Sequence, residues 1–132
     1  MLYLSDIAKY IRKQMPEIKN ISSGIIDTSV NESIGVFENS RSQSTRIALG
    51  GAENTRYYVK KVTILVHWGK TQKEAFNKAM ELYNLFFGIS DIVISGKHIA
   101  FFKVYEPQSI GYTQEKIYEY IIPVEIFVNR EE

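Results

Sequence analysis

The sequence predicts an α+β fold in which a mostly antiparallel β-sheet is packed on one face by two amphipathic helices. Two segments repeat apolar residues at the three-and-four spacing of a helix face. The other regular segments are short, β-rich and joined by turn-forming residues, which suits antiparallel neighbours. The expected order is helix, two strands, a long loop, strand, helix and three strands. A chain of 132 residues is expected to form one domain, residues 1–132.

The first helix is expected to begin at Ser5 or Asp6, either of which can cap it. Pro16 is expected to end it, because the residue before a proline is disfavoured in the helical region. The apolar face of this helix is predicted to consist of Leu4, Ile7, Ala8, Ile11 and Met15.

Residues 24–28 and 34–38 are β-rich runs separated by the turn-forming stretch SVNES, which predicts a hairpin. The polar residues 39–55 that follow form a longer connection than is usual in a compact domain. We expect a flexible arm here, with Gly50 and Gly51 as its hinge because glycine adopts backbone angles that other residues avoid.

Residues 57–68 predict a central strand with one fully apolar face, made of Tyr58, Val62, Ile64, Val66 and Trp68. Thr71 and Glu74 then form a capping box for a second helix, which Gly88 is placed to end. The apolar stripe of this helix is predicted to contain Phe76, Ala79, Met80, Tyr83, Phe86 and Phe87.

The C-terminal third predicts a hairpin of residues 91–95 and 98–106, followed by a last strand within residues 116–128. Pro123 suggests that this strand lies at an edge or contains a bulge. The aromatic residues divide into two expected groups. Tyr10, Phe76, Tyr83, Phe86 and Phe102 are expected in the core, and Tyr57, Tyr105, Tyr112, Tyr118 and Tyr120 at the surface.

Composition excludes several classes of protein. The chain has no cysteine, so disulfide frameworks and thiol chemistry are absent and a reducing compartment such as the cytoplasm is expected. Its N-terminal stretch carries charges through the part that an export signal would keep apolar. No apolar run is long enough to span a bilayer, so no membrane partner is expected. The net charge of +1 does not by itself indicate nucleic-acid binding.

Motifs for catalysis are lacking, and we expect no enzyme activity, cofactor or metal. A phosphate-binding loop needs a glycine, four residues and then Gly-Lys-Ser/Thr before a helix, whereas Gly50 and Gly51 lead into a strand. The two histidines, His67 and His98, have no carboxylate at a metal-binding spacing and are expected to face solvent or a polar edge. No serine lies in a nucleophile elbow.

Charge is uneven along the chain. Residues 40–61 contain five basic residues and one acidic residue, for a net charge of +4, and residues 115–132 contain two basic and five acidic residues, for a net charge of −3. Solvated loops would account for this, but head-to-tail association of copies would account for it too. The interface candidates are Arg41, Arg46, Gly50, Gly51, Arg56, Lys60, Glu119 and Glu125.

The stretch LGGAENTRYYVKKVTILVHWGKTQKEAFNKAMELYNLFFGI, residues 49–89, resembles the minor capsid or tail-terminator proteins of long-tailed bacteriophages. Residues 96–128, GKHIAFFKVYEPQSIGYTQEKIYEYIIPVEIFV, are similar to the closing part of that family. The chain departs from the family in YTQEKIY, residues 112–118, where a turn rich in Asp, Asn and Gly is expected.

This resemblance implies a tail-terminator-like fold, no catalysis, and a virion location after assembly in the bacterial host cytoplasm. It implies a ring of identical copies, hexameric in assembled tails, that caps the tail tube protein and meets the head connector. Arg41, Arg46 and Arg56 would then touch a neighbouring copy or the tube, or line the lumen through which DNA passes. Two alternatives stay open: a nucleic-acid-binding module that uses the basic arm, and a small enzyme with an unrecognised site.

Overall fold

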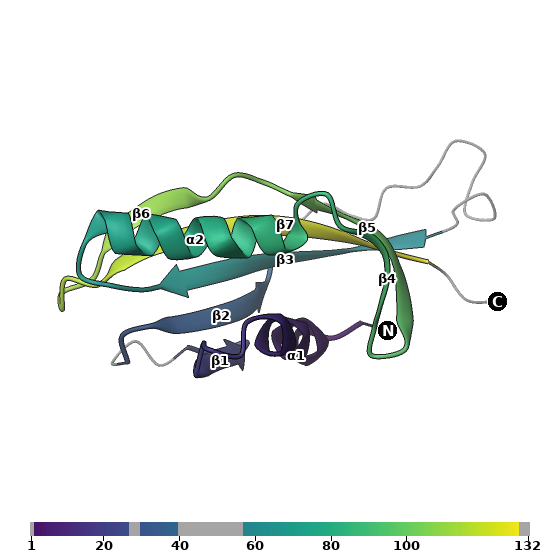
Figure 1. The fold of residues 1–132 in the computed structure, drawn as a ribbon, viewed down its shortest axis with the longest axis horizontal. Coiled ribbons are helices and arrows are strands. Elements are labelled where there is room, and N and C mark those ends of the chain that lie inside the picture. Colours follow the sequence, from purple (N-terminus) through teal and green to yellow (C-terminus); the bar gives the residue numbers. More distant parts are fainter. Residues whose placement is uncertain (1, 27–29, 40–56, 130–132) are drawn as a thin grey trace.

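A computed structural model describes residues 2–26, 30–39 and 57–129, and these form two helices and a seven-stranded sheet (Figure 1). The α+β class and the mostly antiparallel sheet are therefore confirmed. The order is α1 (Leu4–Gln14), β1 (Asn20–Ser23), β2 (Ser33–Glu38), β3 (Tyr57–His67), α2 (Gln72–Phe86), β4 (Ser90–Ile94), β5 (Lys97–Val104), β6 (Gln108–Tyr112) and β7 (Tyr118–Asn129).

Strand β7 lies at the centre of the sheet. The strand order is β1-β2-β3-β7-β5-β4, and β6 pairs with β7 on the same side as β5. The β5 pairing ends at Val104 opposite Val124, and the β6 pairing begins at Gln108 opposite Ile121. One long strand is thus bordered on one side by β3 and on the other by two shorter strands in succession.

Pro123 occupies the point where β5 gives way to β6, and the expectation of an edge strand is wrong. Its carbonyl accepts a hydrogen bond from the Tyr105 amide at 2.9 Å. The amide and carbonyl of one strand residue point to the same side, so the missing amide hydrogen of Pro123 faces the interruption between β5 and β6. An interior proline is tolerated there because the neighbouring strand offers no regular ladder at that position.

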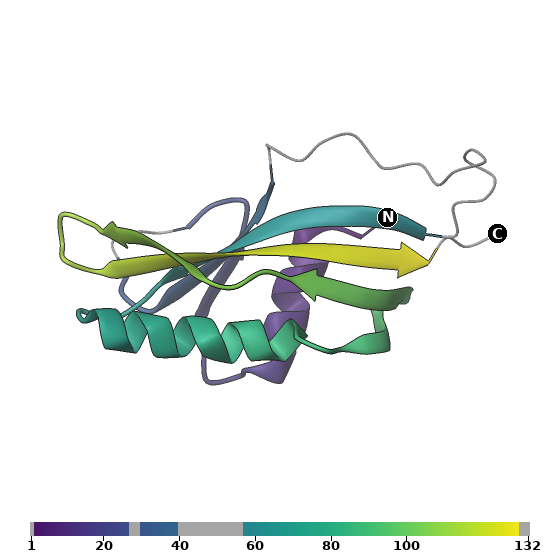
Figure 2. The ribbon, with the colours of Figure 1, turned by 90° about the horizontal axis from the view of Figure 1, so that it is seen from above.

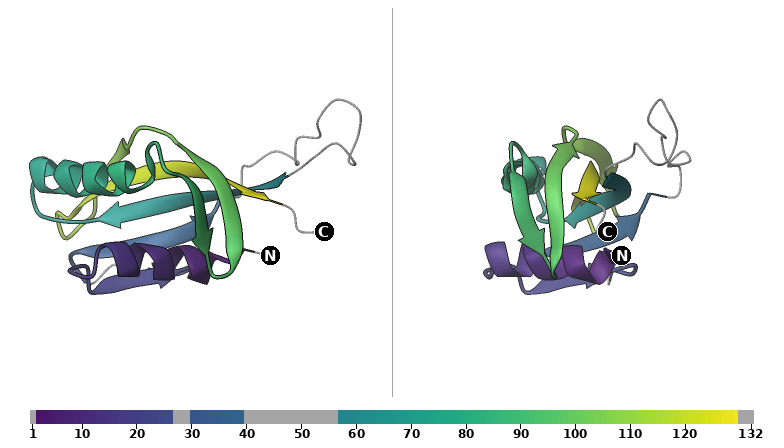
Figure 3. Two further views of the ribbon diagram at one scale, coloured as in Figure 1. Left: turned by 45° about the vertical axis from the view of Figure 1, so that its right-hand side comes forward. Right: turned by 90° about the vertical axis from the view of Figure 1, so that its right-hand side faces the viewer.

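Both helices pack on one face of the sheet, as predicted. Helix α2 runs along β7, β3 and β5, whereas α1 lies across the strands and touches β1, β2 and β4 (Figures 1 and 2). Because β2 and β4 lie far apart in the strand order, contact of both with α1 requires the sheet to curl around that helix (Figure 3). The fully buried side chains of Ile7 and Ile11 fill the resulting trough.

The core joins these helices to alternate residues of the strands. The β3 residues Val62, Ile64 and Val66 are fully buried, which confirms the predicted apolar face of this strand. The Tyr10 ring of α1 lies 5.9 Å from Phe86 and 6.2 Å from Phe102, measured between centroids. Burial raises the pKa of the Tyr10 phenol, because the charged phenolate is disfavoured away from water.

The predicted hairpin of residues 24–28 and 34–38 is wrong. Strand β1 precedes Gly24 and pairs with β2 in parallel, with Ile21 opposite Ile34. Gly24 has a φ of +82° and its amide donates to the Val36 carbonyl at 2.8 Å, so it turns the chain out of β1. The sequence predicts a strand after Gly24 because two apolar residues follow it, a pattern that is also typical of a β-strand.

The ends of the helices follow the capping rules with one shift. Helix α1 begins after Tyr3, and Asp6 caps it from inside the first turn by accepting the Tyr3 amide hydrogen at 2.8 Å. The predicted cap at Ser5 or Asp6 itself is therefore wrong by two to three positions. At α2 the Thr71 hydroxyl accepts the Glu74 amide hydrogen, and Gly88 follows the helix with a φ of +74°, both as predicted.

The second half of the chain contains one strand more than predicted. The hairpin of β4 and β5 is confirmed, and its turn residues Ser95 and Gly96 both have positive φ. Strand β6 lies between the expected strands 98–106 and 116–128, where no strand was predicted. Two aromatic assignments are also wrong, because Phe76 is 43% exposed whereas Tyr120 is buried.

Candidate interaction surface

The face of the sheet opposite the helices is the candidate interaction surface, and we call it the outer face. Alternation along each strand places there the residues that are not in the core. Neither α1 nor α2 covers this face, since both pack among the core residues. The outer face includes Tyr57, Val59, Lys61, Thr63 and Leu65 of β3, Phe101 and Lys103 of β5, Tyr105, and Ile121, Pro123, Glu125 and Phe127 of β7, and the same alternation continues it to His67 of β3 and Glu119 of β7.

Three aromatic rings form a cluster at one end of the outer face. Phe101 and Phe127 are stacked, with centroids 4.3 Å apart and an angle of 15° between their planes. Tyr57 meets Phe127 edge-on at 5.4 Å and Phe101 at 6.1 Å. Tyr57 and Phe101 remain more than a third exposed. The arrangement is an ordered apolar patch, because offset and edge-on contacts are the favoured geometries of aromatic pairs.

A row of charges borders the aromatic cluster. Lys61 of β3 and Lys103 of β5 lie on either side of Glu125 of β7 in the pairing register. Glu125 accepts a hydrogen bond from the Tyr105 hydroxyl at 3.0 Å, and the Lys103 ammonium lies 5.5 Å from the Tyr105 ring centroid. Neither lysine forms an ion pair within residues 2–26, 30–39 and 57–129. Apolar centre and charged border together are typical of a protein interface.

His67 lies at the other end of β3 and is completely buried, so the expectation that it faces solvent or a polar edge is wrong. Its Nδ1 is 2.7 Å from Oε2 of Glu119, the residue opposite it on β7. Burial of an imidazole requires a polar partner, and this carboxylate supplies one. The partner was missed because the two residues are 52 positions apart and only the register of β3 with β7 brings them together.

Ser33 of β2 lies opposite His67, so one row across the sheet holds a serine, a histidine and a glutamate. These are the residue types of a hydrolytic triad. The Ser33 hydroxyl, however, donates to the Val30 carbonyl at 2.8 Å, and both Ser33 and His67 are closed to solvent. A substrate carbonyl could not reach this serine. Within the row, the contact of His67 with Glu119 links β3 to β7.

His98 lies at the opposite end of the sheet and is partly exposed, as expected. Its Nε2 contacts the Asp91 carboxylate and its Nδ1 contacts the Asn129 side chain. The contacts link the ends of β4, β5 and β7. They form a hydrogen-bonded chain on the surface.

The predicted interface residues divide into two groups. Arg41, Arg46, Gly50, Gly51 and Arg56 lie outside the described residues, as does the proposed arm apart from Asn39.

The other three predicted residues are placed by the structure. Lys60 points to the helix-bearing side of the sheet and pairs with Glu38 of β2. Glu119 and Glu125 both lie on the outer side of β7, and Glu119 contacts the buried His67. Lys60 and Glu125 therefore do not belong to one surface of the chain. The aromatic cluster was not among the predicted interface residues, although the neighbouring Phe101 and Phe102 indicated that one ring must face away from the core.

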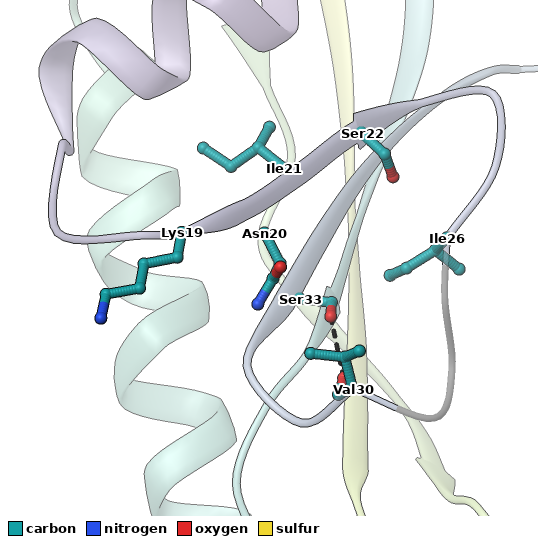
Figure 4. A pocket seen from close by; sticks show the side chains of 7 residues that line it. All are labelled: Lys19, Asn20, Ile21, Ser22, Ile26, Val30 and Ser33. Atoms are coloured by element: carbon teal, nitrogen blue, oxygen red, sulfur yellow. Dashed lines mark hydrogen bonds between the residues drawn. The ribbon is translucent and has the colours of Figure 1, made fainter.

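A shallow pocket of about 210 Å³ lies between β1, β2 and the segment that joins them (Figure 4). It is lined by Lys19, Asn20, Ile21, Ser22, Ile26, Val30 and Ser33. Among the described lining residues, Lys19 alone carries a charge, and its side chain extends away from Ser33 (Figure 4). Small-molecule sites are usually larger, about 300–1,000 Å³, so this pocket does not favour a ligand site.

Within the described ranges, no three His, Cys, Asp or Glu side chains are placed to hold a metal ion. Neither α1 nor α2 is long and apolar enough to cross a membrane. No protein-family model and no curated protein matches the chain.

Proposed function

We propose that the chain is a structural virion protein of a phage or prophage tail, which forms a ring of identical copies that caps the tail tube at its head-proximal end. The observation that carries the proposal is the outer face, where an ordered aromatic patch that neither helix covers lies beside Lys61 and Lys103, which form no ion pair among the described residues. Exposed apolar patches with a polar border mark surfaces that bind other proteins. We propose a ring at the tail, and no other kind of assembly, because residues 49–89 and 96–128 resemble tail-terminator proteins.

The uneven charge of the chain supports association between copies. The basic residues of segment 40–61 and the acidic residues of segment 115–132 would attract each other across a contact between two subunits. Such a contact joins two different surfaces, and head-to-tail contacts of this kind close into rings when their rotation allows it. In the tail, the proposed partners are the tube protein on one side of the ring and the head connector on the other.

Mass measurement in solution, with and without tail tube protein, tests this function. We expect concentration-dependent oligomers at low salt, and closed rings in electron micrographs when tube protein is present. A chain that stays monomeric at all concentrations and low salt, and that does not bind tubes, would rule the function out.

Nucleic-acid binding is the alternative, and the position of Lys61 and Lys103 beside exposed aromatic rings is the observation that favours it. Phe101 and Phe127 cover one face of each other, so each ring keeps at most one face on which a base could stack. Phosphate contacts make affinity fall steeply with salt. A gel-shift titration against single- and double-stranded DNA at two salt concentrations therefore separates the two functions.

A further inference from the structure

Helix α2 carries two apolar stripes, and its own sheet covers only one of them. The first stripe is fully buried and consists of Ala75, Ala79, Leu82 and Phe86. The second stripe consists of Phe76, Met80, Tyr83 and Phe87, each one residue further along the chain. One residue turns a helix by about 100°, so the second stripe lies beside the first and faces partly outward.

The second stripe is substantially exposed at both ends. Phe76 is 43% exposed and touches Tyr120, with ring centroids 5.9 Å apart. Phe87 is 60% exposed and stacks on Tyr83 at 5.3 Å. A surface helix of a globular protein needs one apolar stripe for its own core. A second continuous stripe, about 16 Å long at 1.5 Å per residue, suits a helix that packs between two apolar surfaces.

The outer face of the sheet also carries an apolar surface that neither helix of its own subunit covers. It carries the cluster Tyr57, Phe101 and Phe127, which no described helix covers. Helix α2 lies on the opposite side of the sheet (Figure 2). The stripe and the cluster therefore cannot meet within one molecule, but the stripe of one copy can meet the cluster of the next.

Charge supports the same pairing. The last turn of α2 contains no basic residue, so nothing within the helix offsets the partial negative charge of its C-terminal carbonyls. Phe87 lies at this end. On the outer face, Lys61 and Lys103 border the aromatic cluster and have no ion pair in the described part of the chain. Insertion of Phe87 into the cluster would bring these lysines to the C-terminal end of α2.

We infer that the second stripe of α2 docks on the outer face of a second copy of this chain, with Phe87 against Phe101 and Phe127. The inference rests on the proposed self-assembly and names the two surfaces that perform it. Because the stripe and the face are different surfaces on opposite sides of the sheet, the contact is heterologous and leaves one unused stripe and one unused face for further copies. Repetition of this contact builds the ring.

The test uses two variants, each defective in one surface. Phe87→Glu places a charge in the second stripe of α2, and Phe101→Glu places a charge in the aromatic cluster of the outer face. Both side chains are exposed enough for each variant to fold. Ile25→Glu is the matched control, since Ile25 is 77% exposed and belongs to neither surface. Native mass spectrometry and light scattering report the oligomers, and circular dichroism reports folding. Phe87→Ser and Phe101→Ser replace any glutamate variant that does not fold.

We expect the unaltered chain and Ile25→Glu to form the same oligomers and each of the other two variants to be monomeric. An equimolar mixture of Phe87→Glu and Phe101→Glu should form a two-subunit species and nothing larger, because one intact stripe then meets one intact face.

Three results would overturn the inference. Either variant could form the same oligomers as the unaltered chain, or the mixture of the two variants could stay monomeric. The oligomers could also be lost in Phe87→Glu but kept in Phe101→Glu. These results leave the proposed function standing, because the unaltered chain still assembles. Monomers of the unaltered chain at every concentration and low salt would instead remove the function itself.

Discussion

Two neighbouring phenylalanines of β5 have opposite surroundings. Phe102 is 6% exposed and packs against Phe86 and Tyr10 under the helices, whereas Phe101 is 38% exposed and stacks on Phe127 on the outer face. The residue type and the strand are the same, and only the face differs. The helices pack on the face that holds Phe102, whereas neither helix covers the aromatic cluster around Phe101 on the other face.

The two histidines repeat this contrast with polar groups. His67 is closed to solvent and bonded to Glu119, and His98 is exposed beside Asp91. Each histidine contacts a carboxylate, but the energetic consequences differ because loss of a hydrogen-bond partner is costly only where water cannot replace it. The following four substitutions test the contrast, from the largest expected effect to the smallest.

Phe102→Ala should lower the free energy of unfolding by about 3–5 kcal/mol, because it removes a buried ring and leaves a cavity between α1, α2 and β5. Urea denaturation followed by circular dichroism measures the change. A loss no greater than that of Phe101→Ala would show that the two faces do not differ as described.

Glu119→Ala should cost about 1–3 kcal/mol, because the enclosed His67 ring loses its carboxylate partner. The same denaturation measurement applies. Glu125→Ala serves as the control, since Glu125 lies on the same strand and accepts only the Tyr105 hydroxyl among the described residues. Equal losses for Glu119→Ala and Glu125→Ala would contradict a special role for the His67 contact.

Phe101→Ala should cost about 0.5–1.5 kcal/mol, the worth of its contacts with Phe127 and Tyr57 on a surface that water already reaches. Unfolding measured at two protein concentrations separates this intrinsic cost from any loss of assembly, because association makes stability depend on concentration. A loss of unfolding free energy as large as that of Phe102→Ala would indicate that Phe101 belongs to the core of its own subunit.

Asp91→Asn should change stability by less than about 0.5 kcal/mol, because the side chain is exposed and water can replace its contact with His98. Asparagine also tolerates the positive φ of this position, so the substitution tests the charge alone. Thermal unfolding at low and high salt provides the measurement, and a change above 1 kcal/mol would place His98 with His67 as a structural histidine.

Local patterns predicted the elements whose signals lie within one turn or one strand. The capping residues Thr71 and Gly88, the alternation of β3 and the turn at Ser95 and Gly96 are of this kind. In each case the residues that decide the structure are neighbours in the chain. Capping, alternation and turn conformation depend on backbone geometry over a few residues, and this geometry is set by residue type.

Tertiary structure decided the features that depend on which segments become neighbours. Strand β1 pairs in parallel with β2, and Pro123 is accommodated inside the sheet. The sheet covers only one of the two apolar stripes of α2. The contact of His67 with Glu119 likewise follows from the register of β3 with β7.

The sequence by itself therefore determined the class of the fold and most of its elements. It could not determine which apolar residues stay uncovered, because burial depends on the curl of the sheet and the position of both helices upon it. Alternation predicts that Phe101 and Phe102 face opposite ways. Only the packed helices show which of the two rings is buried and which stays partly exposed.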